Sequence, residues 1–208
     1  MANERITEGI VRDVLRDYGY YLPGNGISVE EQKSEIQSVK SLLSKAGKAA
    51  KGGAGYPEFI ISTQTDTQFI IIFECKSDVR KHVSSDRNRP VEFAVDGVLH
   101  YAKFLSEKYT VIAVAVSGIT KEQLKISTFL FAAGADEGKT LVTESGMPVT
   151  DLLPFDDYYR LASFDPEVAR KRHNDLLDFS RELHELIWAK AKISEEDKPL
   201  LVSGTLIA

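Results

Sequence analysis

The stretch Phe69-Ile-Ile-Ile-Phe-Glu-Cys-Lys-Ser77 joins a run of apolar residues to a charged end at Glu74 and Lys76. An Ile- and Phe-rich run of this length is typical of a buried β-strand. A similar run, Tyr56-Pro-Glu-Phe-Ile-Ile-Ser-Thr63, precedes it, and the polar Thr65-Asp-Thr67 lies between the two. Two strand-like runs separated by a short polar segment predict a β-hairpin.

This hairpin would bring charged residues together at one end of an apolar sheet. Glu58 lies at the start of the first predicted strand and Glu74 at the end of the second, and these two ends are neighbours in a hairpin. Strand alternation places Glu74 and Lys76 on the same face, with Cys75 on the opposite face. Because charges beside an apolar core are costly unless they are paired or bound to metal, this grouping indicates a site.

The predicted grouping has the chemistry of a Mg²⁺ site. The carboxylates of Glu58 and Glu74 and the backbone carbonyl of Cys75 form an all-oxygen ligand set, which Mg²⁺ prefers, and we expect Mn²⁺ to substitute. Lys76 could orient water and stabilise charge that develops on a phosphate. Such a set is suited to the hydrolysis of a phosphodiester, although an ion pair between Glu74 and Lys76 at the surface is the simpler alternative.

The remaining pattern predicts a mixed α/β fold with one central sheet flanked by helices. Apolar residues at helical spacing predict helices over residues 3–21 and 91–107. Ser28, an N-cap residue followed three positions later by Glu31, predicts another helix over 28–45. Runs rich in β-branched residues predict strands over 109–116 and 125–132. Two further predictions are a short hairpin within 136–150 and a loop or short helix over 151–159.

The C-terminal part reads as a helical connector. Asp165-Pro166 is a typical helix start and predicts a long helix to about Lys192. Another helix is expected from Ser194 to Ala208, where the sequence ends in an apolar run. Because natural termini are usually polar and frayed, we expect either that the chain is cut from a longer polypeptide or that this end packs on a partner. The predicted division is one domain over 1–160 and the connector over 161–208.

The composition excludes several classes of protein. A single cysteine in 208 residues excludes a disulfide framework and a cysteine-based zinc site. The sequence has no signal peptide and no apolar run of 18 residues, which predicts a cytoplasmic protein without a membrane partner.

The charge distribution is uneven. The net charge is −5, with 26 basic and 31 acidic residues, which by itself argues against a protein that mainly holds nucleic acid. Two basic segments, residues 33–57 and 79–91, nevertheless flank the predicted site. They supply five candidates for contacts to a DNA backbone: Lys45, Lys48, Lys51, Arg80 and Lys81. The alternative is that both segments are ordinary solvated loops. The acidic total therefore predicts that this chain binds DNA only weakly without help from another domain.

Pro57-Glu58, followed sixteen positions later by Glu74-Cys75-Lys76, resembles the signature of the PD-(D/E)xK nuclease superfamily. The resemblance implies a restriction-endonuclease-like core in which Glu58 replaces the usual Asp, while Glu74 and Lys76 occupy the ExK positions. It also implies an auxiliary acid at Glu8 in the first helix. Glu8 could instead be an ordinary exposed helix residue.

A second element of related nucleases, Gln-x-x-x-Tyr, is matched only in part. In Ala94-Val-Asp-Gly-Val-Leu-His-Tyr-Ala102, Tyr101 fits this element, whereas Gly97 stands where Gln is expected. The resemblance therefore implies an auxiliary role for Tyr101, with core packing as the alternative.

A narrower resemblance covers most of the chain. Ser41-Leu-Leu-Ser-Lys-Ala46 and Gly55-Tyr-Pro-Glu-Phe-Ile-Ile61 are similar to the N-terminal nuclease part of fused restriction–modification enzymes. Residues 183–208 are similar to the start of the helical region that precedes an adenine methyltransferase. The resemblance implies double-stranded DNA as substrate, and methyltransferase and target-recognition domains or subunits as partners.

These observations together predict a Mg²⁺-dependent DNA endonuclease domain of a bacterial restriction–modification system. Two alternatives stay open. One is a non-catalytic module of the same fold that docks DNA or protein, and the other is a nuclease that acts on RNA or branched DNA.

Overall fold

The computed structural model describes residues 4–48 and 54–191 and divides the chain into two units. The first unit ends at Asp165, and the second begins at Pro166 with helix α5 (Pro166–Ala191). α5 begins at the proline where the sequence predicted a long helix. The predicted helix from Ser194 lies outside the described residues.

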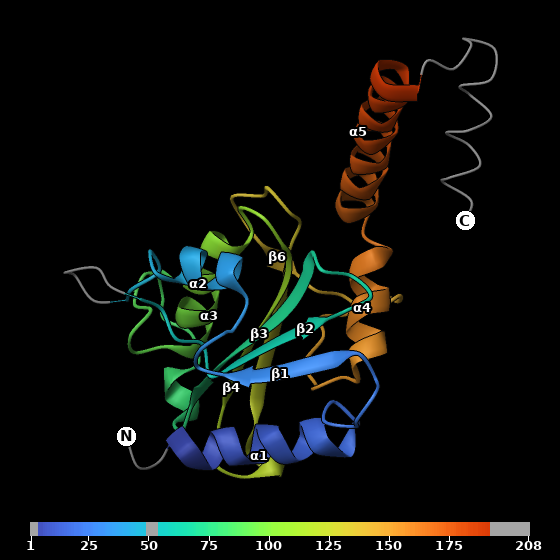
Figure 1. Cartoon of the computed structure of the whole chain (residues 1–208). Coiled ribbons are helices and arrows are strands. Elements are labelled where there is room, and N and C mark those ends of the chain that lie inside the picture. The colour runs from blue at the N-terminus through green and yellow to red at the C-terminus, as the bar shows by residue number, and fades with distance from the viewer. Residues whose placement is uncertain (1–3, 49–53, 192–208) are drawn as a thin grey trace. The chain divides into compact units, whose positions relative to one another are not determined.

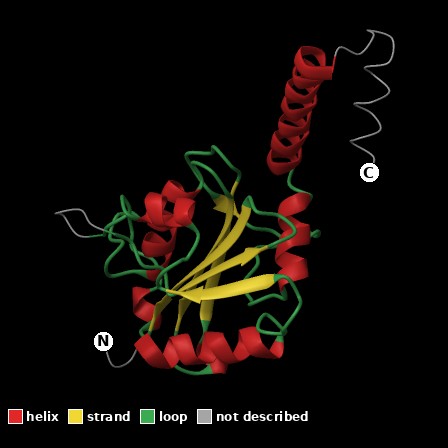
Figure 2. Ribbon diagram, viewed as in Figure 1, coloured by secondary structure: helices red, strands yellow, loops and turns green. Residues whose placement is uncertain are grey.

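The first unit is built on one mixed sheet of six strands in the order β1-β2-β3-β4-β5-β6 (Figure 2). β3 and β4 are parallel, and every other neighbouring pair is antiparallel. This arrangement confirms the predicted α/β class and the predicted hairpin between β2 and β3. The strands are β1 (Ile27–Glu31), β2 (Phe59–Thr63), β3 (Phe69–Lys76), β4 (Thr110–Ser117), β5 (Lys125–Phe131) and β6 (Lys139–Thr140).

Helices cover both faces of this sheet (Figure 1). They are α1 (Glu4–Asp17), α2 (Gln37–Leu43), α3 (Ala94–Leu105) and α4 (Phe155–Ser163), with 3₁₀ turns η1 (Val79–Lys81) and η2 (Lys121–Gln123). On one face, α2 and α3 pack in a single core cluster with Ile60, Ile70 and Ile72. α3 also makes the crossover that parallel strands such as β3 and β4 require.

Aromatic contacts join α4 and the segment after α1 to the other face. The ring of Phe155 meets the rings of Tyr20 and Phe69 edge-on, at centroid distances of 6.2 and 5.8 Å. Phe69 lies at the start of β3, one position out of phase with Ile70 and Ile72. Successive side chains of β3 therefore fill two separate cores, which explains why the strand reads as a continuous apolar run.

The predicted helix over 28–45 is wrong in its first half. Residues Ile27–Glu31 form edge strand β1, in which Val29 pairs with Ile61 of β2, and α2 begins only at Gln37. The serine and glutamate that suggested a helix start supply only a local preference. Pairing with the free edge of β2 provides hydrogen-bond partners for a whole row of backbone N–H and C=O groups, and this outweighs the local preference for a helix.

Two smaller predictions are refined by the structure. The sequence predicted a loop or short helix over 151–159, and the structure has the beginning of α4 there. Within 136–150, Val142 and Pro148 form one antiparallel bridge, whereas β6 pairs with β5. Among the described residues, no helix is both long and apolar enough to cross a membrane.

Candidate active site

The β2–β3 hairpin brings Glu58 and Glu74 together. The register that pairs Phe59 with Phe73 places Glu58, one residue before β2, beside Glu74, one residue further along β3, and the Glu58 backbone N–H donates to the Phe73 carbonyl at 3.0 Å. Glu74 is only 1% exposed. One carboxylate oxygen of each residue, Oε2, is buried without a hydrogen-bond partner.

Lys76 lies on the same face of β3 as Glu74, as strand alternation predicted. Its Nζ is 3.2 Å from Glu74 Oε1 and 3.3 Å from Oε1 of Glu4, at the start of α1. The α1 end is held there by Thr7, whose buried hydroxyl donates to the Gly118 carbonyl at 2.7 Å. Sequence reasoning missed Glu4, because nothing local distinguishes it from other acids of an exposed helix start.

The proximity of the Glu58 and Glu74 carboxyl groups affects their electrostatics. Burial, reinforced by the neighbouring charge of Glu74, raises the pKa of Glu58 well above its usual value. Burial alone would lower the pKa of Lys76, but the carboxylates of Glu74, Glu4 and Glu58 outweigh it and raise the pKa. Lys76 is therefore a permanent cation, whereas Glu58 favours a proton until another cation replaces it.

These residues fit a divalent cation with oxygen ligands. The two unpartnered Oε2 atoms belong to adjacent carboxylates, and such buried acceptors are stabilised by a cation. Among residues 4–48 and 54–191, no cluster of three or more His, Cys, Asp or Glu side chains could hold a metal. The protein ligands would therefore be the carboxylates of Glu58 and Glu74, and backbone or water oxygens would complete the set. The Cys75 carbonyl, predicted from the sequence, is one such backbone oxygen.

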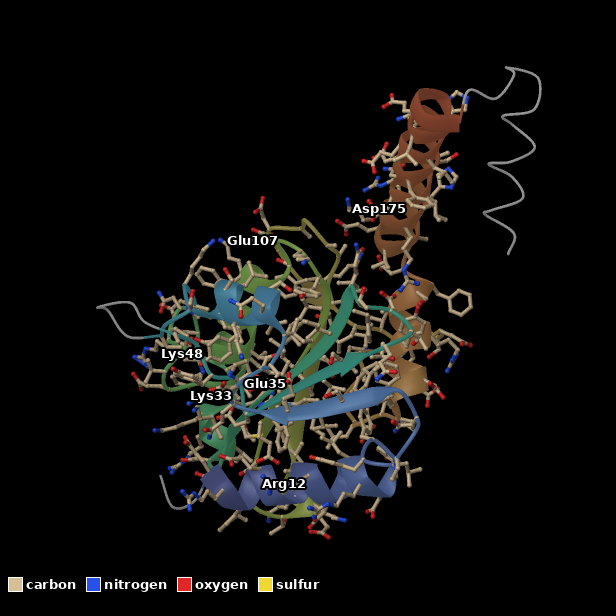
Figure 3. All side chains as sticks on the ribbon, in the orientation of Figure 1. Arg12, Lys33, Glu35, Lys48, Glu107 and Asp175 are labelled. Carbon is tan, nitrogen blue, oxygen red and sulfur yellow. The ribbon has the colours of Figure 1, made fainter. Side chains whose placement is uncertain are left out.

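Lys48 enters the site itself, although the sequence suggested only a contact to DNA. Its Nζ donates a short hydrogen bond to Glu74 Oε1, and it lies 4.3 Å from the centroid of the Tyr101 ring. Figure 3 shows Lys48 on the side of the unit where α2 and α3 lie. In the sequence, Lys48 belongs to the glycine-rich segment 45–55, whose composition carries no signal that this lysine would point into the site.

Tyr101 supports the site from α3 without touching its carboxylates directly. Its hydroxyl accepts a hydrogen bond from the backbone N–H of Tyr56 at 3.1 Å, two residues before Glu58. Burial raises the pKa of this phenol, so the hydroxyl stays neutral. The ring is buried, as the core-packing alternative expects, and it also lies beside Lys48 of the site; its auxiliary role stays a prediction.

The other predicted residues do not meet the carboxylate pair in the same way. Glu8 is half-buried on α1, and burial raises its pKa. Its electrostatic neighbours are Arg5, Arg12, Glu4 and Glu31. Cys75 is fully buried on the opposite face. Lys45 and Lys81 are exposed, and Lys51 lies outside the described residues.

The remaining DNA-backbone candidate, Arg80, is engaged elsewhere. Its guanidinium pairs with Asp78 at 2.8 Å in the exposed turn η1. The carboxylate of Asp78 also caps that turn by accepting from the Arg80 N–H at 2.9 Å. Arg80 is therefore occupied by a local ion pair at the surface.

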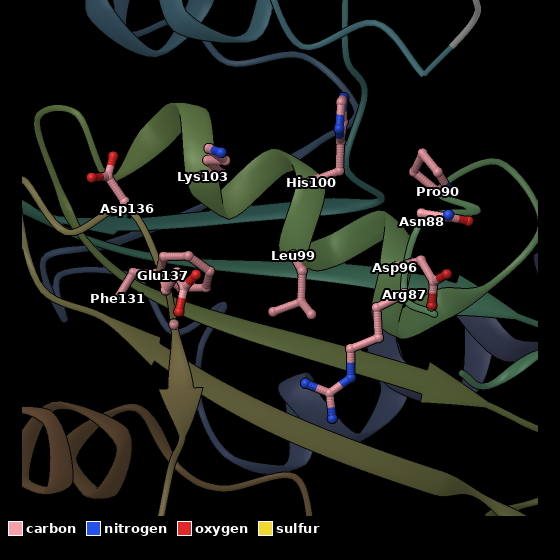
Figure 4. Close-up of a pocket in the computed structure, with 11 residues that line it drawn as sticks. Arg87, Asn88, Pro90, Asp96, Leu99, His100, Lys103, Phe131, Asp136 and Glu137 are labelled. Atoms are coloured by element: carbon pink, nitrogen blue, oxygen red, sulfur yellow. The ribbon is translucent and has the colours of Figure 1, made fainter. Parts of the chain in front are cut away.

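A buried acid that sequence reasoning missed fixes the basic segment before α3. Asp96 is 2% exposed and accepts from the backbone N–H groups of Ser84 at 3.2 Å and Arg89 at 2.9 Å. It also borders an open pocket of about 510 Å³ (Figure 4). Arg87, His100 and Lys103 line this pocket together with Asp136 and Glu137, so its charge is mixed rather than uniformly basic.

Compared with known proteins, the chain matches no family model, no curated protein and no solved structure.

Proposed function

We propose that the first unit of this chain is a Mg²⁺-dependent DNA endonuclease domain with a PD-(D/E)xK-like core. The observation that carries the proposal is the adjacent pair Glu58 and Glu74, each with one buried carboxylate oxygen that has no hydrogen-bond partner, beside the cation Lys76. The order of helix, hairpin with two acids, helix and parallel strand is compatible with that core. Bacterial restriction–modification, with methyltransferase and target-recognition partners, is the biological setting we propose from the sequence resemblance.

Each side chain has a distinct role in this proposal. Glu58 and Glu74 would hold the metal, which when bound polarises the phosphate and lowers the pKa of an attacking water. Lys76, held between Glu74 and Glu4, keeps a positive charge where negative charge develops on the phosphate. The backbone between Tyr56 and Glu58 is fixed by Tyr101, which keeps the first carboxylate in place.

A non-catalytic module is the second candidate, and a specific observation favours it. Glu74 is already paired with two lysines, Lys48 and Lys76, as an acid with a purely structural role would be. Such a protein would keep its fold and any DNA binding but would neither require a divalent ion nor cut DNA.

Cleavage of supercoiled plasmid by the 208-residue chain separates the two candidates. With Mg²⁺ or Mn²⁺, we expect Glu58→Gln, Glu74→Gln and Lys76→Met each to reduce cleavage by about 100-fold or more. Glu107→Gln is the matched control, because Glu107 is an exposed acid two residues after the end of α3. Circular dichroism would show that each variant is folded. Equal cutting by wild type and the three site variants would refute the proposed site.

A further inference from the structure

The side chain of Lys48 lies between β3 and α3 and contacts both. Its side chain is only 13% exposed, and its Nζ contacts Glu74 of β3 and faces the ring of Tyr101 on α3. An ammonium over an aromatic face gains electrostatic attraction that grows as water is excluded. Lys48 is thus an interior cation and is unavailable to a DNA backbone in this conformation.

Gly97 and Gly55 leave the room that this arrangement needs. A Cβ added at Gly97 would lie 2.7 Å from Lys48 Nζ and 3.0 Å from Glu74 Cδ. A Cβ at Gly55 would lie 2.5 Å from the Tyr101 ring. Gly97 stands at the position where related nucleases carry Gln, and the ammonium group of Lys48 lies against this glycine.

The Glu74 carboxylate of the site is already paired with lysine ammonium groups before any metal binds. Two ammonium groups, of Lys48 and Lys76, share the same oxygen of Glu74, Oε1, and the second carboxylate in an ion pair with them is that of Glu4. A divalent ion at the free Oε2 atoms would enter beside both lysines and would be repelled by them. Lys76 is also paired with Glu4, whereas the described contacts of Lys48 within this site are with Glu74 and the Tyr101 ring.

We propose that Lys48 is an internal counter-ion of Glu74 that competes with the divalent metal and so weakens the affinity of the site for it. The inference rests on the proposed function, since it concerns the same carboxylates. It assigns to Lys48 a role in setting the metal concentration that the site requires, instead of a contact to DNA. In the absence of metal, the same lysine stabilises the buried carboxylate of Glu74.

Calorimetric titration of the 208-residue chain with Mn²⁺ tests this role without relying on activity. We expect Lys48→Met to bind Mn²⁺ at least about tenfold more tightly than wild type, because a unit charge beside the ion is removed. Lys45→Met is the matched control: it removes the same charge from an exposed position three residues earlier and should leave the affinity within about twofold of wild type. Lys48→Gln removes the charge but keeps an N–H donor, and it serves if Lys48→Met fails to fold.

The outcomes distinguish this inference from the proposed function. If the Lys48 variants bind Mn²⁺ as wild type does, or more weakly, the competition is refuted, while plasmid cleavage still judges the nuclease. If Glu58→Gln and Glu74→Gln bind Mn²⁺ no worse than wild type, the proposed site fails. If neither wild type nor a Lys48 variant binds Mn²⁺, both proposals fail.

Discussion

The contact between α3 and the carboxylate of Glu74 can be tested with one methyl group. In Gly97→Ala the added Cβ would lie 2.9 Å from the Pro90 carbonyl oxygen and 3.0 Å from Glu74 Cδ. The head of Lys48, at 2.7 Å, belongs to a flexible side chain and can move aside. The backbone carbonyl and the buried carboxylate cannot yield as easily, so the helix or the strand must shift.

The magnitude follows from two opposing terms. Replacing a glycine within a helix by alanine stabilises it by about 1 kcal/mol, whereas overpacking a tight interior costs about 1–3 kcal/mol. Gly9→Ala in α1 provides the matched control, because a Cβ at Gly9 meets nothing within 4 Å. The helix term is common to both variants, so their difference in free energy of unfolding isolates the packing cost.

Urea unfolding of the full chain, followed by circular dichroism, measures this difference. We expect Gly9→Ala to be more stable than wild type by up to about 1 kcal/mol, and Gly97→Ala to be less stable than Gly9→Ala by about 1–3 kcal/mol. For a chain of this size, that gap corresponds to a difference in melting temperature of roughly 2–12 °C. Equal stabilisation by both alanines would refute the close packing of α3 on Glu74.

Three further predictions concern stability. His82 is buried between Ser117 Oγ and Ser127 Oγ, each 2.9 Å from a ring nitrogen, and burial with nearby Lys125 lowers its pKa to about 4. Between pH 6.5 and 4 the unfolded chain therefore binds a proton that the folded chain excludes, so the free energy of unfolding falls by up to about 3 kcal/mol as the pH falls. Urea unfolding midpoints across this range should depend less on pH in His82→Gln than in wild type. An equal pH dependence in both would contradict the assignment. Thr7→Val removes the donor to the Gly118 carbonyl and should cost about 1–2 kcal/mol in urea unfolding, whereas a neutral result would mean that this bond contributes nothing. Ile71, at the centre of β3, pairs with Ile61 and Ile112; its truncation to Ala should cost about 2–5 kcal/mol and to Val about 0.5–1.5 kcal/mol, and equal losses would argue against a fully packed core.

Local patterns were sufficient for the fold class and for the hairpin. The apolar runs ending in Glu74-Cys75-Lys76 and starting at Pro57-Glu58 predict strands from composition and length, and the short polar segment between them predicts their antiparallel pairing. Once the hairpin is assumed, the neighbouring ends follow from its topology. The structure places Glu58 beside Glu74, and Glu74 with Lys76 on one face, for these reasons.

Edge strand β1 could not be predicted in the same way. Residues Ile27–Glu31 are only partly buried, in an irregular pattern, so they carry no clear period of two. Their conformation depends on pairing with β2, which lies about thirty residues further along the chain. Local signals at Ser28 and Glu31 therefore favoured the wrong element.

The sequence by itself determined which residues could carry chemistry: two acids and a lysine at one end of a buried hairpin. Tertiary structure alone decided which cations neutralise them. Lys48 is 26 positions from Glu74, and Glu4 is 72 positions from Lys76, yet each forms an ion pair within the site. Contacts at such separations depend on how α1, α2 and α3 pack on the sheet, and residue spacing carries no information about that packing.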